Sequence, residues 1–438
     1  MKKIIAAMMI IALVVVMAVS VSAADLTEGI YTYKVNDDGQ TVTITKIKVE
    51  AAIDLEIPST LGGKKVTAIG DKALNWGSAN TNVKKLTLPE TLETIGKFAF
   101  GNNRAVKELV IPNSVTMIDE DAFAKFEGLE SLTIGTGVKT VGERAFSRTK
   151  SLKTITVAAG NTALKVENNC LIDIANAKVL TAKAEATIAI PEGVKVIGDH
   201  AFYNSVVTNV TFPASLEKIG VQAFYGAKPV SVVLTSVKEI GAQAFYANKS
   251  LTTLELGNAL ETIDYEAFRG CTGIAKIVLP QGFKTMGYNA FYGTTGLRTL
   301  VIPKSVEEIG YGAFVNGGLK SANDSHVYYE GTRAEYEAIN WTLNPSAGTT
   351  QNNDAISEDA SRATKHYESC MNNPNGWTHS EGATCTYCNP PAGGQTPPAG
   401  GTTPNAPQTG SSVTVLAVVA VVALAATAVV ISKRRIED

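Results

Sequence analysis

The sequence has few of the side chains on which catalysis and metal binding depend. Its 438 residues include 4 His and 5 Cys, and neither a Gly-x-Ser-x-Gly nor a His-Glu-x-x-His motif occurs. Charged residues make up 18% of the chain, and the formal net charge is -2. A nucleic-acid binder needs a basic patch, so this charge balance excludes a nucleic-acid partner. We expect a protein that is not an enzyme.

A six-residue motif occurs ten times in the chain, and most copies lie 21 to 23 residues apart. The motif is a branched or flexible apolar residue, then Gly or Asp, two variable residues, and Ala-Phe, with Ala73-Leu74 in the first copy. The copies begin at Ile69, Ile95, Ile118, Val141, Ile197, Ile219, Ile240, Ile263, Met286 and Ile309. Such a period predicts a solenoid, because each unit buries its apolar face only by stacking on its neighbours.

Each repeat also contains a short extended half. In Val106–Pro112 apolar residues alternate with polar ones, which predicts a strand, and the proline marks its end. Together the two halves resemble the BspA-like leucine-rich repeat family of bacterial surface proteins. The resemblance covers about residues 30 to 340 and implies a right-handed leucine-rich solenoid with short parallel strands and about ten rungs, a rung being one turn of the solenoid.

The repeats are predicted over residues 69–318, between a strand-rich N-terminal cap at 25–68 and a C-terminal cap at 319–343. Phe146 and Phe202 are 56 residues apart, whereas two regular units need about 46. We therefore predict an island at residues 158–190. Its two strand-like runs predict a hairpin over the stack, with a structural role favoured over binding.

Both ends of the chain carry signals for export. Residues 1–23 have the basic start, apolar core and small-residue cleavage site of a signal peptide. Residues 413–431 are uncharged and apolar, about 28 Å long as a helix, and long enough to span a bilayer. The basic tail at 432–438 predicts a cytoplasmic C-terminus with the repeats outside.

A short motif precedes the apolar span. It consists of Ala406, Pro407, Gln408, Thr409 and Gly410. It resembles the Leu-Pro-x-Thr-Gly sorting signal of Gram-positive surface proteins. The resemblance implies cleavage by a sortase after Thr409 and linkage to peptidoglycan in the cell wall or at the cell surface, after the chain has spanned the membrane. Ala406 replaces the usual Leu, which favours a sortase of altered specificity; the alternative is an ordinary membrane anchor.

A polar segment at 344–389 and a Pro/Gly-rich spacer at 390–409 separate the repeats from the anchor. The polar segment holds a cluster that follows His366 and contains Cys370, His379, Cys385 and Cys388. These four side chains have the chemistry of a zinc site, but an exported protein more often pairs such cysteines. A disulfide from Cys370 to Cys385 or Cys388, free thiols, and bound zinc all remain open. No other cofactor is indicated.

Seven tyrosines recur at two offsets in the later repeats. Tyr203, Tyr225, Tyr246 and Tyr292 follow the Phe, and Tyr265, Tyr288 and Tyr311 stand two positions before the Ala. Equal offsets in a solenoid lie about 4.8 Å apart, so two aromatic ladders are predicted. They are suited to binding glycans or proteins, or else they stabilise neighbouring rungs.

Other polar and sulfur-containing residues of the repeats have structural explanations. Asp119, Glu120 and Asp121 occupy turn positions and are expected to be solvated, and Cys170 and Cys271 are expected to be buried. The predicted function is an adhesin-like, wall-anchored protein that binds surface proteins or glycans of a host or neighbouring cell. A passive structural stalk or wall-layer component is the alternative, and a polysaccharide-acting enzyme is a weaker third.

Overall fold

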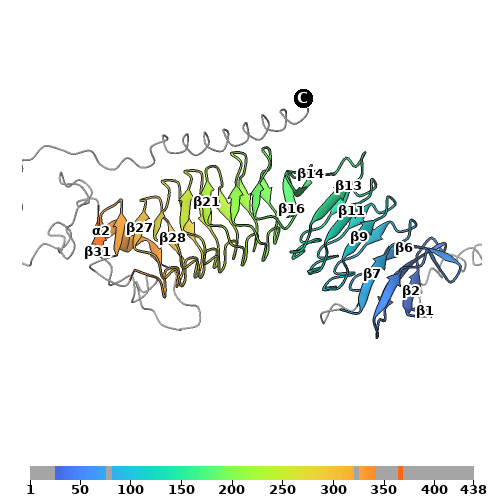
Figure 1. The fold of residues 1–438 in the computed structure, drawn as a ribbon. Helices are drawn as coiled ribbons and strands as arrows, with labels where there is room; N and C mark the ends of the chain where they lie inside the picture. Colours follow the sequence, from blue (N-terminus) through green and yellow to red (C-terminus); the bar gives the residue numbers. More distant parts are fainter. Residues whose placement is uncertain (1–24, 75–80, 320–324, 342–363, 368–438) are drawn as a thin grey trace, which may run out of the picture.

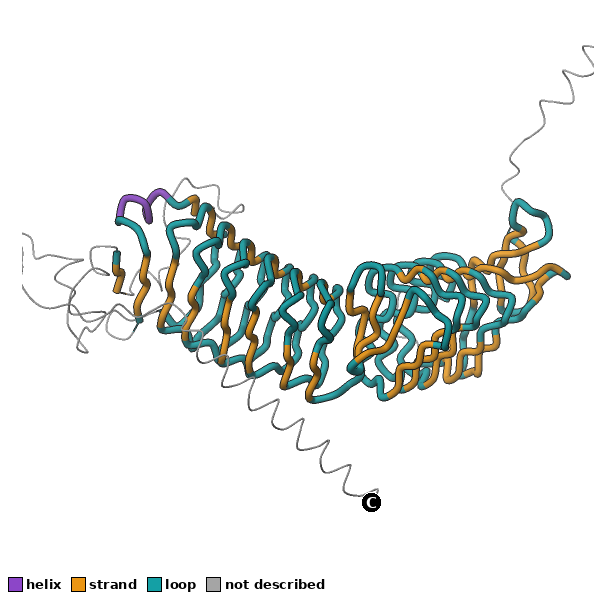
Figure 2. The backbone as a smooth tube through the Cα atoms, turned by 90° about the horizontal axis from the view of Figure 1, so that it is seen from above, coloured by secondary structure: helices purple, strands orange, loops and turns teal. Residues whose placement is uncertain are grey.

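The described residues form a β-solenoid with almost no helix, as the repeats predicted (Figure 1). It has about 12 turns, where the motif copies predicted about ten. A computed structural model describes residues 25–74, 81–319, 325–341 and 364–367. Every rung contributes a short strand to one side of the solenoid and most add a longer strand to the other, so successive strands form rows along the molecule (Figure 2). The rungs divide into an N-terminal block, up to Val157, and a C-terminal block, from Thr187 onward, each with its own apolar core.

The N-terminal block begins with antiparallel strands and continues with parallel ones. One sheet has the order β1-β2-β3-β6-β8-β10-β12, and β5 pairs with β6 at its margin. Its strands are β1 (Leu26–Glu28), β2 (Tyr31–Val35), β3 (Thr41–Ile47), β5 (Thr60–Leu61), β6 (Lys64–Ile69), β8 (Thr94–Ile95), β10 (Met117–Ile118) and β12 (Thr140–Val141). The other side carries β4 (Ile53–Glu56) with β7 (Val83–Thr87), and β9 (Glu108–Ile111), β11 (Ser131–Ile134) and β13 (Thr154–Val157).

The C-terminal block repeats this arrangement with parallel strands throughout. Its short strands are β18 (Val196–Ile197), β20 (Lys218–Ile219), β22 (Glu239–Ile240), β24 (Thr262–Ile263), β26 (Thr285–Met286), β28 (Glu308–Ile309) and β30 (Asn340–Trp341). The opposite strands are β17 (Thr187–Ala189), β19 (Asn209–Thr211), β21 (Ser231–Leu234), β23 (Thr253–Leu256), β25 (Lys276–Val278), β27 (Thr299–Ile302), β29 (His326–Tyr329) and β31 (Thr364–His366). The motif Ile residues pair in register, for example Ile219 with Ile240.

The Phe residues of the motif stack into two columns inside the solenoid. Neighbouring ring centroids are 5.6 and 5.8 Å apart in the N-terminal block and 4.7 to 5.8 Å apart in the C-terminal block. Their planes differ by 9° or less. Each ring buries a large apolar area and packs on its neighbours, so one column runs through the core from Phe100 to Phe146 and the other from Phe202 to Phe314.

The residue before the motif Ala adopts a left-handed backbone in all ten copies. These residues are Lys72, Phe98, Asp121, Arg144, His200, Gln222, Gln243, Glu266, Asn289 and Gly312. Non-Gly residues seldom adopt this conformation because Cβ approaches the following carbonyl oxygen. The sharp turn points peptide groups toward the neighbouring rungs, where they form hydrogen bonds. For example, the Phe224 N–H donates to the Ala244 carbonyl at 2.7 Å.

The island lies within the stack and joins the two blocks. Its strands are β14 (Leu164–Glu167), β15 (Cys170–Asp173) and β16 (Lys178–Ala182), antiparallel to one another, and β16 pairs in parallel with β18. Leu171 packs in the N-terminal core, and its neighbour Ile172 packs in the C-terminal core. The predicted hairpin is present, but it does not lie over the stack, because both of its faces are apolar and each covers one block.

The C-terminal end is closed by α2 (Arg333–Ala338) and by β31, which comes from the polar segment. Thr332 and Glu335 form a capping box at the start of α2. No membrane-spanning helix occurs in the four described stretches of the chain. The signal peptide, the sorting motif, the spacer, the apolar span and the basic tail predicted from the sequence all lie outside those stretches.

Replacing Phe245 with Ala is expected to destabilise the C-terminal block by about 3–5 kcal/mol, since it removes a fully buried ring from the middle of the column. The midpoint of denaturant unfolding measures the loss. Val233→Ala, at a side chain 37% exposed, is the control and is expected to change the midpoint little. Equal midpoints for the two variants would contradict the role of the column.

Leu171→Ala and Ile172→Ala form a matched pair that tests the island. We expect the first to weaken hydrogen-exchange protection mainly in the N-terminal block, and the second mainly in the C-terminal block, because the two side chains enter different cores. Each change removes buried methylene groups of similar volume. The same exchange pattern in both variants would contradict a two-faced island.

Candidate functional site

Three tyrosines form a stacked column on the C-terminal block. The ring of Tyr225 lies 4.8 Å from that of Tyr203 and 4.7 Å from that of Tyr246, with planes 8° and 2° apart. We call Tyr203, Tyr225 and Tyr246 the tyrosine column. They follow the motif Phe in consecutive rungs, so the same register that stacks the core rings also stacks these rings outside.

Arginine side chains cover both ends of the tyrosine column. Arg269 occupies the next rung, with its guanidinium carbon 5.8 Å from the Tyr246 centroid and 4.6 Å from the Tyr292 centroid. Tyr292 is therefore separated from the column, and the aromatic ladder predicted to include it ends at Tyr246. At the other end, Arg148 lies 4.0 Å over the Tyr203 ring. These contacts cover the ring faces, so the column presents ring edges and hydroxyl groups.

Tyr265, Tyr288 and Tyr311 occupy one offset in three consecutive rungs, and we call them the exposed tyrosine row. Tyr265 is 42% exposed and Tyr288 is 38% exposed. Within the described part of the chain, no ring contact joins Tyr265 to Tyr288, unlike the rings of the column. Partial burial raises the pKa of Tyr265, and a hydrogen bond with Glu266 adds to the shift.

A ladder of polar side chains runs beside the tyrosine column. His200 Nε2 lies 2.7 Å from Gln222 Oε1, Gln222 donates to Gln243, and Gln243 Nε2 donates to Glu266 Oε2 at 2.6 Å. Glu266 is only 4% exposed and forms an ion pair with Arg269. We call His200, Gln222, Gln243 and Glu266 the amide ladder. The amide ladder was not predicted from the sequence, although a polar residue before the motif Ala in four consecutive copies was a usable signal.

The environment of His200 favours its neutral form. Burial lowers the pKa of His200 to about 4; the hydrogen bond with Gln222 opposes this shift, and the nearby Arg148 and Arg144 add to it. Gln222 donates through its amide nitrogen to Gln243, so its oxygen accepts from His200 Nε2–H. The His200 imidazole also meets the Tyr203 ring edge to face at 5.4 Å and holds that ring in position.

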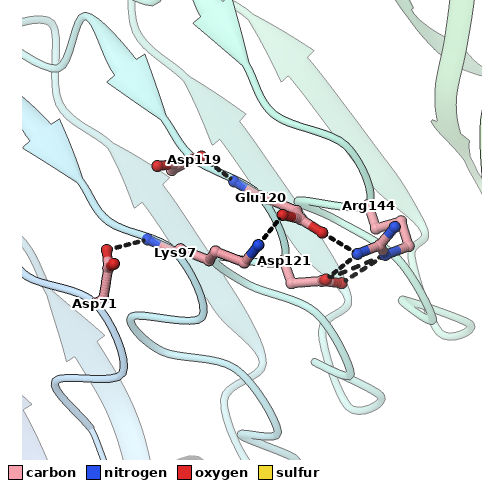
Figure 3. Close-up of polar contacts among 6 residues, drawn as sticks. All are labelled: Asp71, Lys97, Asp119, Glu120, Asp121 and Arg144. Carbon is pink, nitrogen blue, oxygen red and sulfur yellow. Dashed lines mark hydrogen bonds and ion pairs between the residues drawn. The ribbon is translucent and has the colours of Figure 1, made fainter.

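The N-terminal block has charged contacts at the offset of the amide ladder and at the position before it (Figure 3). Lys97 donates to Glu120, and Arg144 contacts both Glu120 and Asp121, with 2.8 Å from its Nη2 to Asp121 Oδ2. Asp121 is only 6% exposed, and burial raises its pKa although Arg144 opposes the shift. The expectation that these carboxylates are solvated is therefore wrong for Asp121, because Arg144 of the next rung pairs with its carboxylate.

The structure also locates several of the Cys and His residues. Cys170 and Cys271 are buried free thiols, as expected, and burial raises the pKa of both to about 12. His366 is fully buried against the C-terminal cap, where its Nε2 lies 3.0 Å from Nδ1 of His326. No metal-binding group of three His, Cys, Asp or Glu side chains occurs among the described residues. Cys370, His379, Cys385 and Cys388, for which a disulfide, free thiols and bound zinc were left open, lie outside them.

The family comparison agrees with the repeat architecture. The model of the BspA type leucine rich repeat region matches in 6 copies, over residues 53–179 and 195–320, which is more than half of the chain. The gap between the two matched ranges falls at the end of the island. A comparison with curated protein sequences gave no match.

Several solved structures are similar to this chain. A leucine rich cell surface protein from Faecalibacterium prausnitzii A2-165 is 21% identical, with 74% of this chain and 100% of that chain covered and a TM-score of 0.44. A leucine-rich repeat protein from Eubacterium ventriosum ATCC 27560 is 19% identical, with coverages of 74% and 97% and a TM-score of 0.48. The pneumococcal vaccine antigen PcpA is 17% identical, with coverages of 74% and 99% and a TM-score of 0.45.

We predict that His200 makes the stability of the protein depend on pH. Between about pH 6.5 and pH 4 the unfolded chain binds a proton that buried His200 does not, so stability falls with decreasing pH. The loss is at most about 3 kcal/mol. Thermal unfolding across this range is expected to show a shallower pH dependence in His200→Gln, because Gln already occupies this offset at Gln222 and Gln243. Parallel curves for the two proteins would contradict the prediction.

Proposed function

Because the chain belongs to the BspA-type leucine-rich repeat family, we propose that it is a non-enzymatic, surface-anchored binding protein of the adhesin type. In this proposal the solenoid lies outside the cell, and its C-terminal block contacts a macromolecule of a host or neighbouring cell. The exposed tyrosine row makes the contact. The partner is a surface protein or a glycan.

The exposure of large side chains in this row carries the proposal. Tyr265 and Tyr288 are 42% and 38% exposed, and Val221, at the same offset two rungs before Tyr265, is 40% exposed. Ala242 lies between them, and Tyr311 follows, so five consecutive rungs carry apolar or aromatic residues along one line. Tyrosine combines apolar area with a hydroxyl group and is enriched where proteins meet partners. The line therefore has the chemistry of a contact surface.

The sequence signals at both ends support surface anchoring. The signal peptide at 1–23 directs export, and the apolar span at 413–431 holds the chain in the membrane until a sortase acts at the motif 406–410. Transfer of Thr409 to peptidoglycan leaves the repeats outside a Gram-positive cell. The Pro/Gly-rich spacer at 390–409 separates the solenoid from the wall, since such composition favours an extended chain.

Chemistry within the repeats supports binding over catalysis. The thiols of Cys170 and Cys271 are buried with raised pKa values, which keeps them protonated and unreactive. His200 is held in the amide ladder, and the buried carboxylates Asp121 and Glu266 pair with arginines. The strongest competing function is a passive stalk, which the stacked tyrosine column would suit because stacking strengthens the rungs without a ligand.

We expect the purified full-length chain to bind saturably to at least one member of an array of extracellular-matrix proteins, mucins, serum proteins and bacterial glycans. The triple variant Tyr265→Ala, Tyr288→Ala and Tyr311→Ala should lose most of this binding with an unchanged unfolding temperature. Tyr265 and Tyr288 are exposed and Tyr311 is half-buried, so their removal costs contact area and little core packing.

The matched control is the double variant Val110→Ala and Met117→Ala, which removes apolar side chains 58% and 39% exposed from the N-terminal block. It is expected to bind like the wild type. An equal loss of binding in the control variant would show that the contact does not depend on the exposed tyrosine row. An array without any saturable signal would overturn the proposal in favour of the stalk.

A further inference from the structure

A second left-handed backbone position lies two residues after the motif Phe. In most rungs Gly or Asn occupies it, as Asn102, Asn204, Gly226, Gly270, Gly293 and Asn316. The exceptions are Lys125, Ala247 and, in the last rung of the N-terminal block, Arg148, with φ 63, 60 and 61. Gly and Asn tolerate this conformation, whereas Arg is strained there. Such strain persists only where the surrounding structure maintains it, and at Arg148 the side chain contacts a ring of the next block.

The guanidinium group of Arg148 crosses the junction between the two blocks. It lies over Tyr203, the first residue of the tyrosine column, with 4.0 Å between its central carbon and the ring centroid. Among the described residues no carboxylate or carbonyl group binds Arg148. The other described arginines all have such partners: Arg104, Arg144, Arg269 and Arg333 pair with carboxylates, and Arg298 donates to backbone carbonyls.

The hydroxyl groups of the tyrosine column follow Arg148 along the solenoid and form a line of polar groups with it. The hydroxyl groups of Tyr203, Tyr225 and Tyr246 have no hydrogen-bond partner among the described residues, and none is a buried unpartnered group. Since the rings are 4.7 to 4.8 Å apart, their hydroxyls form a regular row. A guanidinium stacked on a ring keeps N–H groups available for a planar anion. One cation followed by several hydroxyls thus lines the junction.

We propose that Arg148 binds the carboxylate of an acidic sugar at the end of a glycan chain and that the hydroxyls of Tyr203 and Tyr225 bind the same sugar. This site rests on the proposed binding function and adds a second contact, distinct from the exposed tyrosine row. Arg148 forms a two-point hydrogen bond with the carboxylate, and the tyrosine hydroxyls bind ring hydroxyls of the sugar.

The charge pattern favours a glycan with one terminal acid over a polyanion. A sulfated or phosphorylated polymer would need a cation at each repeat, but the line after Arg148 consists of neutral hydroxyls for three rungs. The cation that ends it, Arg269, is already paired with Glu266. Hydroxyl donors and acceptors in a regular row match the many hydroxyls of a sugar, which needs a partner for each one it buries.

The test is calorimetric titration of the full-length chain with sialyllactose, with a disaccharide that ends in glucuronate, and with neutral lactose. At least one acidic probe is expected to bind and lactose is not, and the comparison of the two acidic probes identifies the sugar. Arg148→Gly should weaken binding at least about tenfold. Its unfolding temperature should not fall, because Gly suits the left-handed backbone. Arg148→Gln provides a second test with a side chain of similar length.

Lys125→Gly is the matched control. Lys125 occupies the same backbone position one rung earlier, with φ 63, and the substitution removes the same positive charge. It should bind like the wild type. Equal binding of lactose, no binding of either acidic probe, or unchanged binding by both Arg148 variants would overturn the site. If acidic sugars fail but the protein array gives a signal at the exposed tyrosine row, the site fails and the proposed function stands. If both fail, both proposals fall.

Discussion

The constraint on which this structure depends is the register between neighbouring rungs. A single rung has too little apolar surface to bury its own Phe ring, so it is stable only when the next rung covers that ring. Stacking at 4.7 to 5.8 Å and the left-handed turn before each Ala hold the rungs in this relation. The strain of the turn is compensated by peptide groups that bind across rungs, as between Phe224 and Ala244.

Because the register is fixed, residues at the same offset of successive repeats lie next to one another and form a row along the solenoid. The offset before Ala holds the pair Asp121 and Arg144 in the N-terminal block and the amide ladder in the C-terminal block. The offset after Phe holds small residues first and then the tyrosine column. The backbone is thus nearly the same in both blocks, while the side chains at these two offsets change from charged and small ones to amide and aromatic ones. Function can vary along such a molecule without any change in fold.

The repeat made much of this architecture predictable. Ten motif copies fix the rungs, the core Phe rings and the rows in which Tyr203, Tyr225 and Tyr246 meet. Contacts that do not follow the period were not predictable. His326 and His366 are 40 residues apart and meet only because β31 pairs with β29. The end of the aromatic ladder, by contrast, follows the period: Arg269 stands after Phe268 where neighbouring copies have Tyr, and it lies between Tyr246 and Tyr292.

The junction differs physically from every other step between rungs. Strands β12 and β18 are not paired, so the ladder of short strands is interrupted there. Side chains and the island bridge the gap instead: Lys178 forms an ion pair with Glu143 at 2.6 Å, and Thr149 meets Thr181 at 3.2 Å. Contacts between side chains adapt more easily than a backbone ladder. A ligand seated on Arg148 and Tyr203 would therefore contact both blocks at the place where their relation is least constrained by hydrogen-bonded strands, so binding there would also stiffen the solenoid.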